Sequence, residues 1–145
     1  MADPLSIAAS IASLLTLGIQ SCRCLDKFFS KISDAPVEVK LYQLCFQAMD
    51  ATFCELQTIC GSWPTTGEVT FPIGFAKRLT SCTEDLQSVD AFIRRVELDM
   101  GTTRVKRTCA KVKYAMFADD RLGKLSVRLQ QYQASFTLDL IAINT

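Results

Sequence analysis

The sequence contains no histidine, which removes the commonest general base near neutral pH. Its seven cysteines include no Cys-x-x-Cys pair, so neither a zinc ribbon nor a Cys/His finger can be assembled. A glycine-rich phosphate loop and a nucleophile elbow are also missing. We therefore expect the protein not to be an enzyme, and we expect it to need no metal and no cofactor.

Formal charge is missing from the start of the chain, between Asp3 and Arg23. The uncharged segment 4–22 reads PLSIAASIASLLTLGIQSC, and a bilayer-spanning helix needs roughly 20 mostly apolar residues. Asp3 and Pro4 are typical of a helix start, whereas a secretory signal has positive charge ahead of its apolar core. We expect a protein that is cytoplasmic when resting, with most cysteines behaving as small hydrophobic residues and reduced thiols favoured over disulfides.

Helical periodicity divides the segment and its continuation into two faces. Apolar or small residues recur at three- and four-residue steps: Ile7, Ile11, Leu14, Gly18, Cys22, Leu25, Phe29 and Ile32. The opposite face is weakly polar at first and charged later: Ser6, Ser10, Ser13, Thr16, Gln20, Arg23, Lys27 and Lys31. A long bundle helix with a poor polar face explains this pattern, and so does a helix that serves both in a bundle and in a membrane.

Charge is distributed unevenly along the chain. Residues 1–100 carry 8 basic and 12 acidic side chains, a net −4, whereas residues 101–145 carry 8 basic and 3 acidic side chains, a net +5. One short predicted helix holds a basic cluster of Arg104, Lys106, Arg107, Lys111 and Lys113. Such a cluster is attracted to anionic lipid headgroups, although a solvated helix face explains it equally well. Nucleic acid is disfavoured as a partner, since the chain is nearly neutral and has no aromatic–basic motif.

Apolar stripes predict an all-α fold, an antiparallel bundle of four to five helices in a single domain spanning residues 1–145. The expected helices cover about 4–32, 35–60, 71–99, 103–117 and 120–141, with Gly61 ending the second. The second stripe is expected to contain Leu41, Cys45, Met49, Phe53, Leu56 and Cys60. We expect the first helix to pack against the third and the fifth.

The opening residues 1–12, MADPLSIAASIA, closely resemble the start of fungal HeLo-like domains. These are N-terminal domains of fungal STAND (NLR-like) receptors and related cell-death effectors. The pattern Leu125-x-x-x-Leu129-x-x-Tyr132-x-x-Ser135-Phe136-x-Leu138 is similar to the closing helix of that family. The family often has a tryptophan before that helix, where this chain has Lys113-Tyr114. The resemblance covers the whole chain, and its specific part is the first dozen residues.

The resemblance implies a bundle similar to the executioner domain of the mixed-lineage kinase-like necroptosis protein. It implies a role in programmed cell death and heterokaryon incompatibility, with oligomerisation that releases the N-terminal helix to permeabilise the plasma membrane. The resemblance places the inserting segment at residues 4–22, whose apolar residues are Leu5, Ile7, Ile11, Leu14, Leu15, Leu17 and Ile19. Implied partners are anionic phospholipids of the plasma membrane, further copies of the chain, and C-terminal regulatory domains of a longer protein.

Two functions from different classes fit these expectations. The first is a membrane-active death effector, and the second is a protein-protein interaction adapter that oligomerises and never contacts lipid. The first helix discriminates between them, because insertion requires that its weakly polar face tolerate hydrocarbon. A serine or threonine hydroxyl can do so by bonding to the preceding helical turn, and no charge precedes Arg23. This favours the membrane-active effector.

Overall fold

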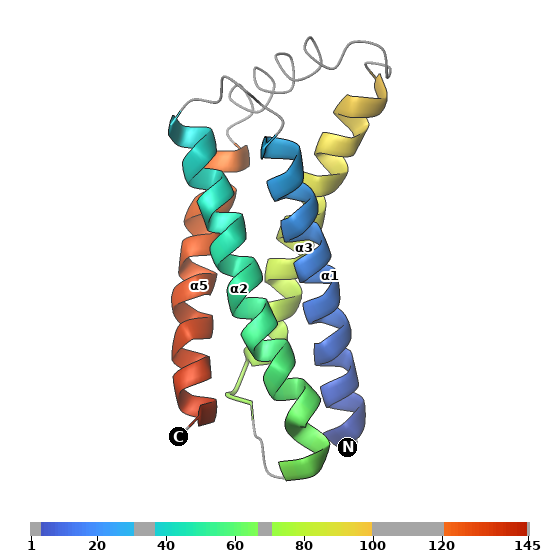
Figure 1. Ribbon diagram of the computed structural model, residues 1–145, viewed down its shortest axis with the longest axis vertical. Coiled ribbons are helices and arrows are strands. Elements are labelled where there is room, and N and C mark those ends of the chain that lie inside the picture. Colours follow the sequence, from blue (N-terminus) through green and yellow to red (C-terminus); the bar gives the residue numbers. More distant parts are fainter. Residues whose placement is uncertain (1–3, 31–36, 67–70, 100–120, 145) are drawn as a thin grey trace.

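The computed structural model describes residues 4–30, 37–66, 71–99 and 121–144, and every secondary-structure element within these ranges is a helix (Figure 1). The helices are α1 (Pro4–Ser30), α2 (Val37–Thr66), α3 (Phe75–Asp99) and α5 (Arg121–Asn144). The expected all-α bundle is confirmed. The helix expected at 103–117 lies outside the described residues.

Each described helix lies beside two of the other three. Helices α2 and α3 both contact α1 and α5, whereas α1 and α5 occupy opposite corners of the bundle (Figure 1). Successive helices run in opposite directions, but the neighbours α1 and α3 are parallel, as are α2 and α5. The expectation that α1 packs on α5 is therefore wrong. The reason is that Phe53 of α2 lies between Gly18 of α1 and Phe136 of α5.

The two largest differences from the expected helix boundaries are at the end of α2 and the start of α3. Helix α2 continues past Gly61 to Thr66, so the glycine does not end it, in keeping with the weakness of helix propensity as a predictor. Helix α3 begins at Phe75 instead of residue 71, because Gly74 has φ of +80°, a left-handed conformation that cannot continue a helix backwards. The N–H groups of Phe75 and Arg78 bond to the carbonyls of Pro72 and Gly74 at 3.1 and 2.9 Å and start the first turn.

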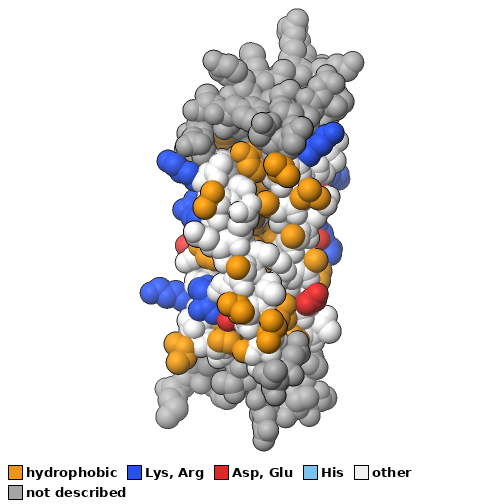
Figure 2. Space-filling view, turned by 90° about the vertical axis from the view of Figure 1, so that its left-hand side faces the viewer, with side chains coloured by type: hydrophobic (Ala, Val, Ile, Leu, Met, Phe, Trp, Pro, Cys, Tyr) orange, Lys and Arg blue, Asp and Glu red, His pale blue; other side chains and the backbone are white. Residues whose placement is uncertain are grey.

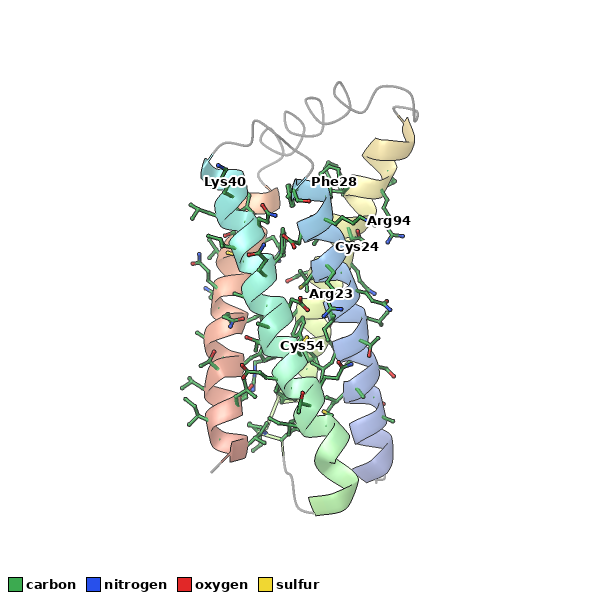
Figure 3. The ribbon with its side chains drawn as sticks, viewed as in Figure 1. Arg23, Cys24, Phe28, Lys40, Cys54 and Arg94 are labelled. Carbon is green, nitrogen blue, oxygen red and sulfur yellow. The ribbon has the colours of Figure 1, made fainter. Side chains whose placement is uncertain are left out.

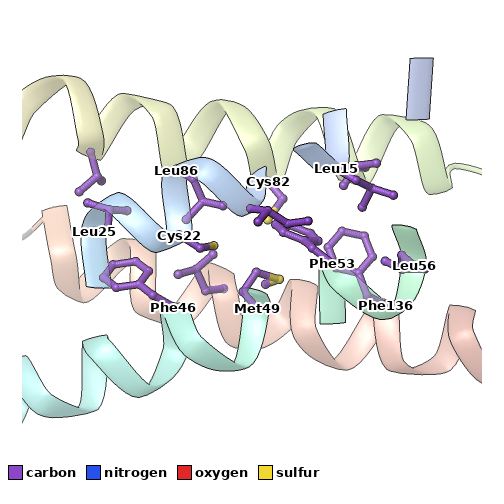
Figure 4. Packing of buried hydrophobic residues seen from close by; sticks show 14 of the residues in the cluster. Leu15, Cys22, Leu25, Phe46, Met49, Phe53, Leu56, Cys82, Leu86 and Phe136 are labelled. Atoms are coloured by element: carbon purple, nitrogen blue, oxygen red, sulfur yellow. The ribbon is translucent and has the colours of Figure 1, made fainter. Parts of the chain in front are cut away.

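One hydrophobic core runs along the bundle axis (Figure 4). Helical spacing predicts inward stripes in the described parts of α3 (Phe75, Leu79, Cys82, Leu86, Val89 and Ile93) and of α5 (Leu125, Leu129, Tyr132, Phe136 and Leu140). All of these residues are buried except Tyr132, which is half-buried. The stripe of α2 is wrong at its start, since Leu41 is 53% exposed while Phe46 is buried. Phe46 turns inward because its ring stacks on Phe29 of α1, with ring centroids 5.7 Å apart.

A partly buried ion pair joins the start of α3 to the end of α5. The Nη2 atom of Arg78 donates to both carboxylate oxygens of Asp139, at 2.9 and 2.7 Å. The Asp139 side chain is 9% exposed, and Nη1 of Arg78 also donates to the carbonyl of Ile73 at 3.1 Å. This pair holds the turn before α3 against α5, so that the lower end of the bundle is fixed independently of α1.

Candidate membrane-insertion helix

The apolar residues of α1 expected to insert are divided between the core and the surface. Ile11, Leu15 and Ile19 are buried, Leu14 is half-buried, and Leu17 is 41% exposed. Leu5 and Ile7 lie within α1, but their side chains are outside the described part of the chain. Because three of these side chains already belong to the core, α1 cannot insert into a bilayer while the bundle remains closed.

Gly18 is the point of closest approach between α1 and α2. A Cβ atom added at Gly18 would lie 2.6 Å from Cε2 of Phe53, closer than real Cβ contacts. The absence of a side chain at Gly18 therefore allows the Phe53 ring to lie directly against the backbone of α1. The same ring packs against Phe136 of α5, with centroids 5.9 Å apart, so Phe53 lies at the centre of the bundle (Figure 4).

The outer face of α1 carries no charge over its first described turns. The exposed residues of this face are Ala9, Ser10, Ser13, Thr16, Leu17 and Gln20. The hydroxyl of Thr16 donates to the carbonyl of Ala12 at 3.0 Å, so its hydrogen is satisfied within the helix. Apart from Gln20, this face holds only small, hydroxyl or apolar side chains.

The second half of α1, taken as residues 23–30, is held by polar contacts in addition to apolar packing, whereas its first half comprises residues 4–22. Arg23 bonds through Nε to Asp50 of α2 at 3.4 Å and through Nη2 to Sγ of Cys54 at 3.7 Å (Figure 3). The hydrogen bond to Asp50 and the negative charge of that carboxylate raise the pKa of the Arg23 guanidinium. On the side that faces α3, Nη2 of Arg94 donates a hydrogen bond to Sγ of Cys24 at 3.9 Å.

Asp26 extends this polar attachment towards the end of α1. Its Oδ1 atom accepts hydrogen bonds from the side-chain amides of Gln43 at 2.8 Å and Gln47 at 3.0 Å, both on α2. The first half has one described side-chain hydrogen bond to a neighbouring helix, from Gln57 to Thr16 at 3.1 Å. The two halves of α1 are thus attached differently, the first mainly by apolar packing and the second also by charged and amide groups.

Two thiols are buried at the contact between α1 and α3. Cys22 and Cys82 are 1% and 0% exposed. Burial raises the pKa of both thiols; nearby cysteines and Asp50 raise that of Cys22 further, and Asp85 that of Cys82. Both thiols therefore stay protonated near neutral pH. As thiols they are poor nucleophiles, since the thiolate is the reactive form.

The basic cluster expected to bind lipid headgroups lies outside the described residues: Arg104, Lys106, Arg107, Lys111 and Lys113. The polar attachment of the second half of α1 was missed by the sequence analysis. Its partners on α2 are far away in the sequence, and the spacing of Asp50, Gln43 and Gln47 gave no signal for it.

Among the described residues, no helix combines the length and the apolarity needed to cross a membrane. Comparison of the whole chain with family models, with curated proteins and with solved structures gives no match.

Proposed function

We propose that this domain is a membrane-permeabilising cell-death effector. It acts through self-association and through insertion of the first half of α1, residues 4–22. The observation that supports this most is the uncharged outer face of α1, from Ala9 to Gln20, on a helix whose inner face is apolar. Once that half leaves the bundle, both of its faces can enter hydrocarbon without burying a charge. The resemblance of residues 1–12 to HeLo-like domains supports the same function.

The free energy of release also favours this segment over the other helices. Full burial of a leucine or isoleucine side chain contributes about 1.5–3 kcal/mol relative to water, so exposing the inner face of α1 to solvent is unfavourable. In a bilayer, Ile11, Leu15 and Ile19 regain an apolar environment, which offsets most of that loss. The contacts of Arg23 and Asp26 with α2 keep the second half on the bundle.

A lysine at position 13 is expected to separate folding from membrane activity. Ser13 is exposed and lies at the midpoint of residues 4–22, so Ser13→Lys should change the stability of the folded bundle by less than about 0.5 kcal/mol. At the centre of a membrane helix the same charge costs about 2.5–3.5 kcal/mol. Dye leakage from anionic liposomes should fall on the order of 100-fold in rate at equal protein concentration.

Ser88→Lys is the matched control, because Ser88 is also exposed but lies on α3. This variant should leak dye as the parent chain does, with an unchanged melting temperature. A helical, monomeric Ser13→Lys variant that retained full leakage would refute insertion of this segment. Loss of leakage in both variants would point to a general effect of added positive charge.

The alternative, an interaction adapter that never contacts lipid, is favoured by one observation. Leu41 and Leu44 of α2 are 53% and 58% exposed on a helix that is otherwise well packed. An adapter predicts that the domain leaves dye inside liposomes of any composition while still forming oligomers. Leakage and oligomer size, measured on the same samples, distinguish the two functions.

A further inference from the structure

The outer face of α2 is apolar where solvent would favour charge. Leu41, Leu44, Ala48 and Ala51 are all exposed, and their spacing of three and four residues places them along one side of the helix. A shallow groove between α2 and α5 adjoins them, and its lining includes Leu41, Leu44 and Ala48. On the face of the molecule formed by α2 and α5, apolar side chains are scattered among uncharged ones, and basic and acidic side chains lie mainly towards the margins (Figure 2).

Opposite charges delimit this stripe on α2. Lys40 is exposed at its upper end and Glu55 at its lower end, about 22 Å apart along the helix at about 1.5 Å per residue. The charged residue between them, Asp50, is turned towards α1, where it bonds to Arg23. The exposed stripe from Leu41 to Ala51 is therefore uncharged, with a positive end and a negative end.

This distribution is complementary to itself when one copy is turned end over end. If the α2 helices of two copies cross antiparallel with the midpoint between Gln47 and Ala48, Lys40 of each copy faces Glu55 of the other. In the same register Leu44 faces Ala51, so a large side chain meets a small one, and Ala48 faces Gln47. An isologous two-fold contact requires this kind of self-complementarity.

We propose that the outer face of α2 is a self-association surface, which binds a second copy of this chain in an antiparallel two-fold arrangement. Val127 of α5 is 56% exposed but lines a separate hollow with Lys124 and Arg128, so the proposed surface does not include it. A stripe of this length on one helix buries less than the roughly 800 Å² per partner of standard interfaces. Interfaces below that size occur mainly in weak or transient complexes, so we expect a dimer that dissociates on dilution. The proposal specifies the self-association that the proposed function includes, but it does not depend on lipid.

Charge reversal tests the arrangement directly. In a two-fold dimer, Lys40→Glu or Glu55→Lys alone turns both ion pairs into like-charge contacts, and should weaken dimerisation on the order of tenfold at low salt. The double variant Lys40→Glu/Glu55→Lys restores both pairs and should dimerise like the parent chain. An equimolar mixture of the two single variants should also dimerise, because each supplies the charge that the other lacks. Sedimentation velocity over a micromolar dilution series measures all four samples.

An apolar substitution and its control test the surface independently of charge pairing. Leu44→Glu should abolish dimers, with a dissociation constant raised at least about 100-fold, because an unpaired carboxylate would be buried at the contact. Since Leu44 is exposed in the monomer, circular dichroism and melting temperature should be unchanged. Leu17→Glu is the matched control: Leu17 is also a partly exposed leucine, it lies on α1, and its variant should dimerise normally.

The same two variants keep this proposal separate from the membrane function. Leu17→Glu should lose dye leakage while retaining dimers, whereas Leu44→Glu should lose dimers whatever its effect on leakage. A chain that is monomeric throughout the dilution series overturns the proposal. The proposal is also overturned if Leu44→Glu leaves the dimer intact. It is likewise overturned if the double variant fails to restore the dimerisation that each single charge reversal weakens.

Discussion

Replacing Phe53 by alanine is expected to remove about 3–5 kcal/mol from the free energy of unfolding, since the ring is fully buried. This is a large share of the 5–15 kcal/mol typical of a native domain. The ring contacts the backbone of α1 at Gly18 and the ring of Phe136, so its loss leaves a cavity where three helices meet. Chemical denaturation followed by circular dichroism measures the change.

The proposed function adds a second expectation for Phe53→Ala. Loosening the contact with α1 lowers the free energy of releasing its first half, so dye leakage should increase at concentrations where the variant is still folded. Phe136→Ala is the matched control, because it removes an equally buried ring from α5, a helix that has no described contact with α1. Equal leakage by both variants would assign the effect to general instability instead of release of α1.

Alkaline conditions are expected to destabilise the bundle through its buried thiols. The pKa values of Cys22 and Cys82 are raised above the ordinary value of 9.0 in the folded state, chiefly by burial. The unfolded chain therefore releases these protons first, and the stability present below pH 9 is lost as the pH rises. Each thiol can remove at most about 1.4 kcal/mol per pH unit, so the free energy of unfolding should fall progressively above pH 9.

Urea denaturation at a series of pH values tests this expectation against a variant without the two thiols. Cys22→Ala/Cys82→Ala should be less stable than the parent chain at neutral pH, because it loses buried sulfur atoms. Its stability should nevertheless fall less steeply above pH 9. All other side chains are the same in both proteins, so the difference between the two slopes isolates the thiols. Parallel slopes would show that the thiols do not contribute.

Periodicity predicted most of the core but not its full extent in α2. In α3, Phe75, Leu79, Cys82, Leu86, Val89 and Ile93 are all buried, because one unbroken stripe at helical spacing has one consistent inward direction. In α2, Phe46, Met49, Phe53, Leu56 and Cys60 recur at steps of three and four residues and are all buried. Leu41 lies about a quarter of a turn away from this face, so the spacing itself favours Phe46, and the prediction that began the stripe at Leu41 chose the wrong register.

The position of the candidate helix could be predicted, whereas its attachment could not. The apolar face of α1 and the lack of charge before Arg23 follow from the order of residues alone. The contacts of Arg23 with Asp50 and of Asp26 with two glutamines depend on which helices are neighbours. The expectation named α3 and α5 as the helices that pack on α1, whereas the structure places α2 and α3 there.

The diagonal relation of α2 and α3 has a consequence for exchange between molecules. These two helices have no described contact with each other, and α1 packs against both of them. If the first half of α1 departs, the faces of α2 and α3 that it covered lose their common partner and remain apolar. They fit the α1 helix of another copy as well as their own, since the two helices are identical. Such reciprocal exchange of an element is domain swapping, and its extent rises with protein concentration.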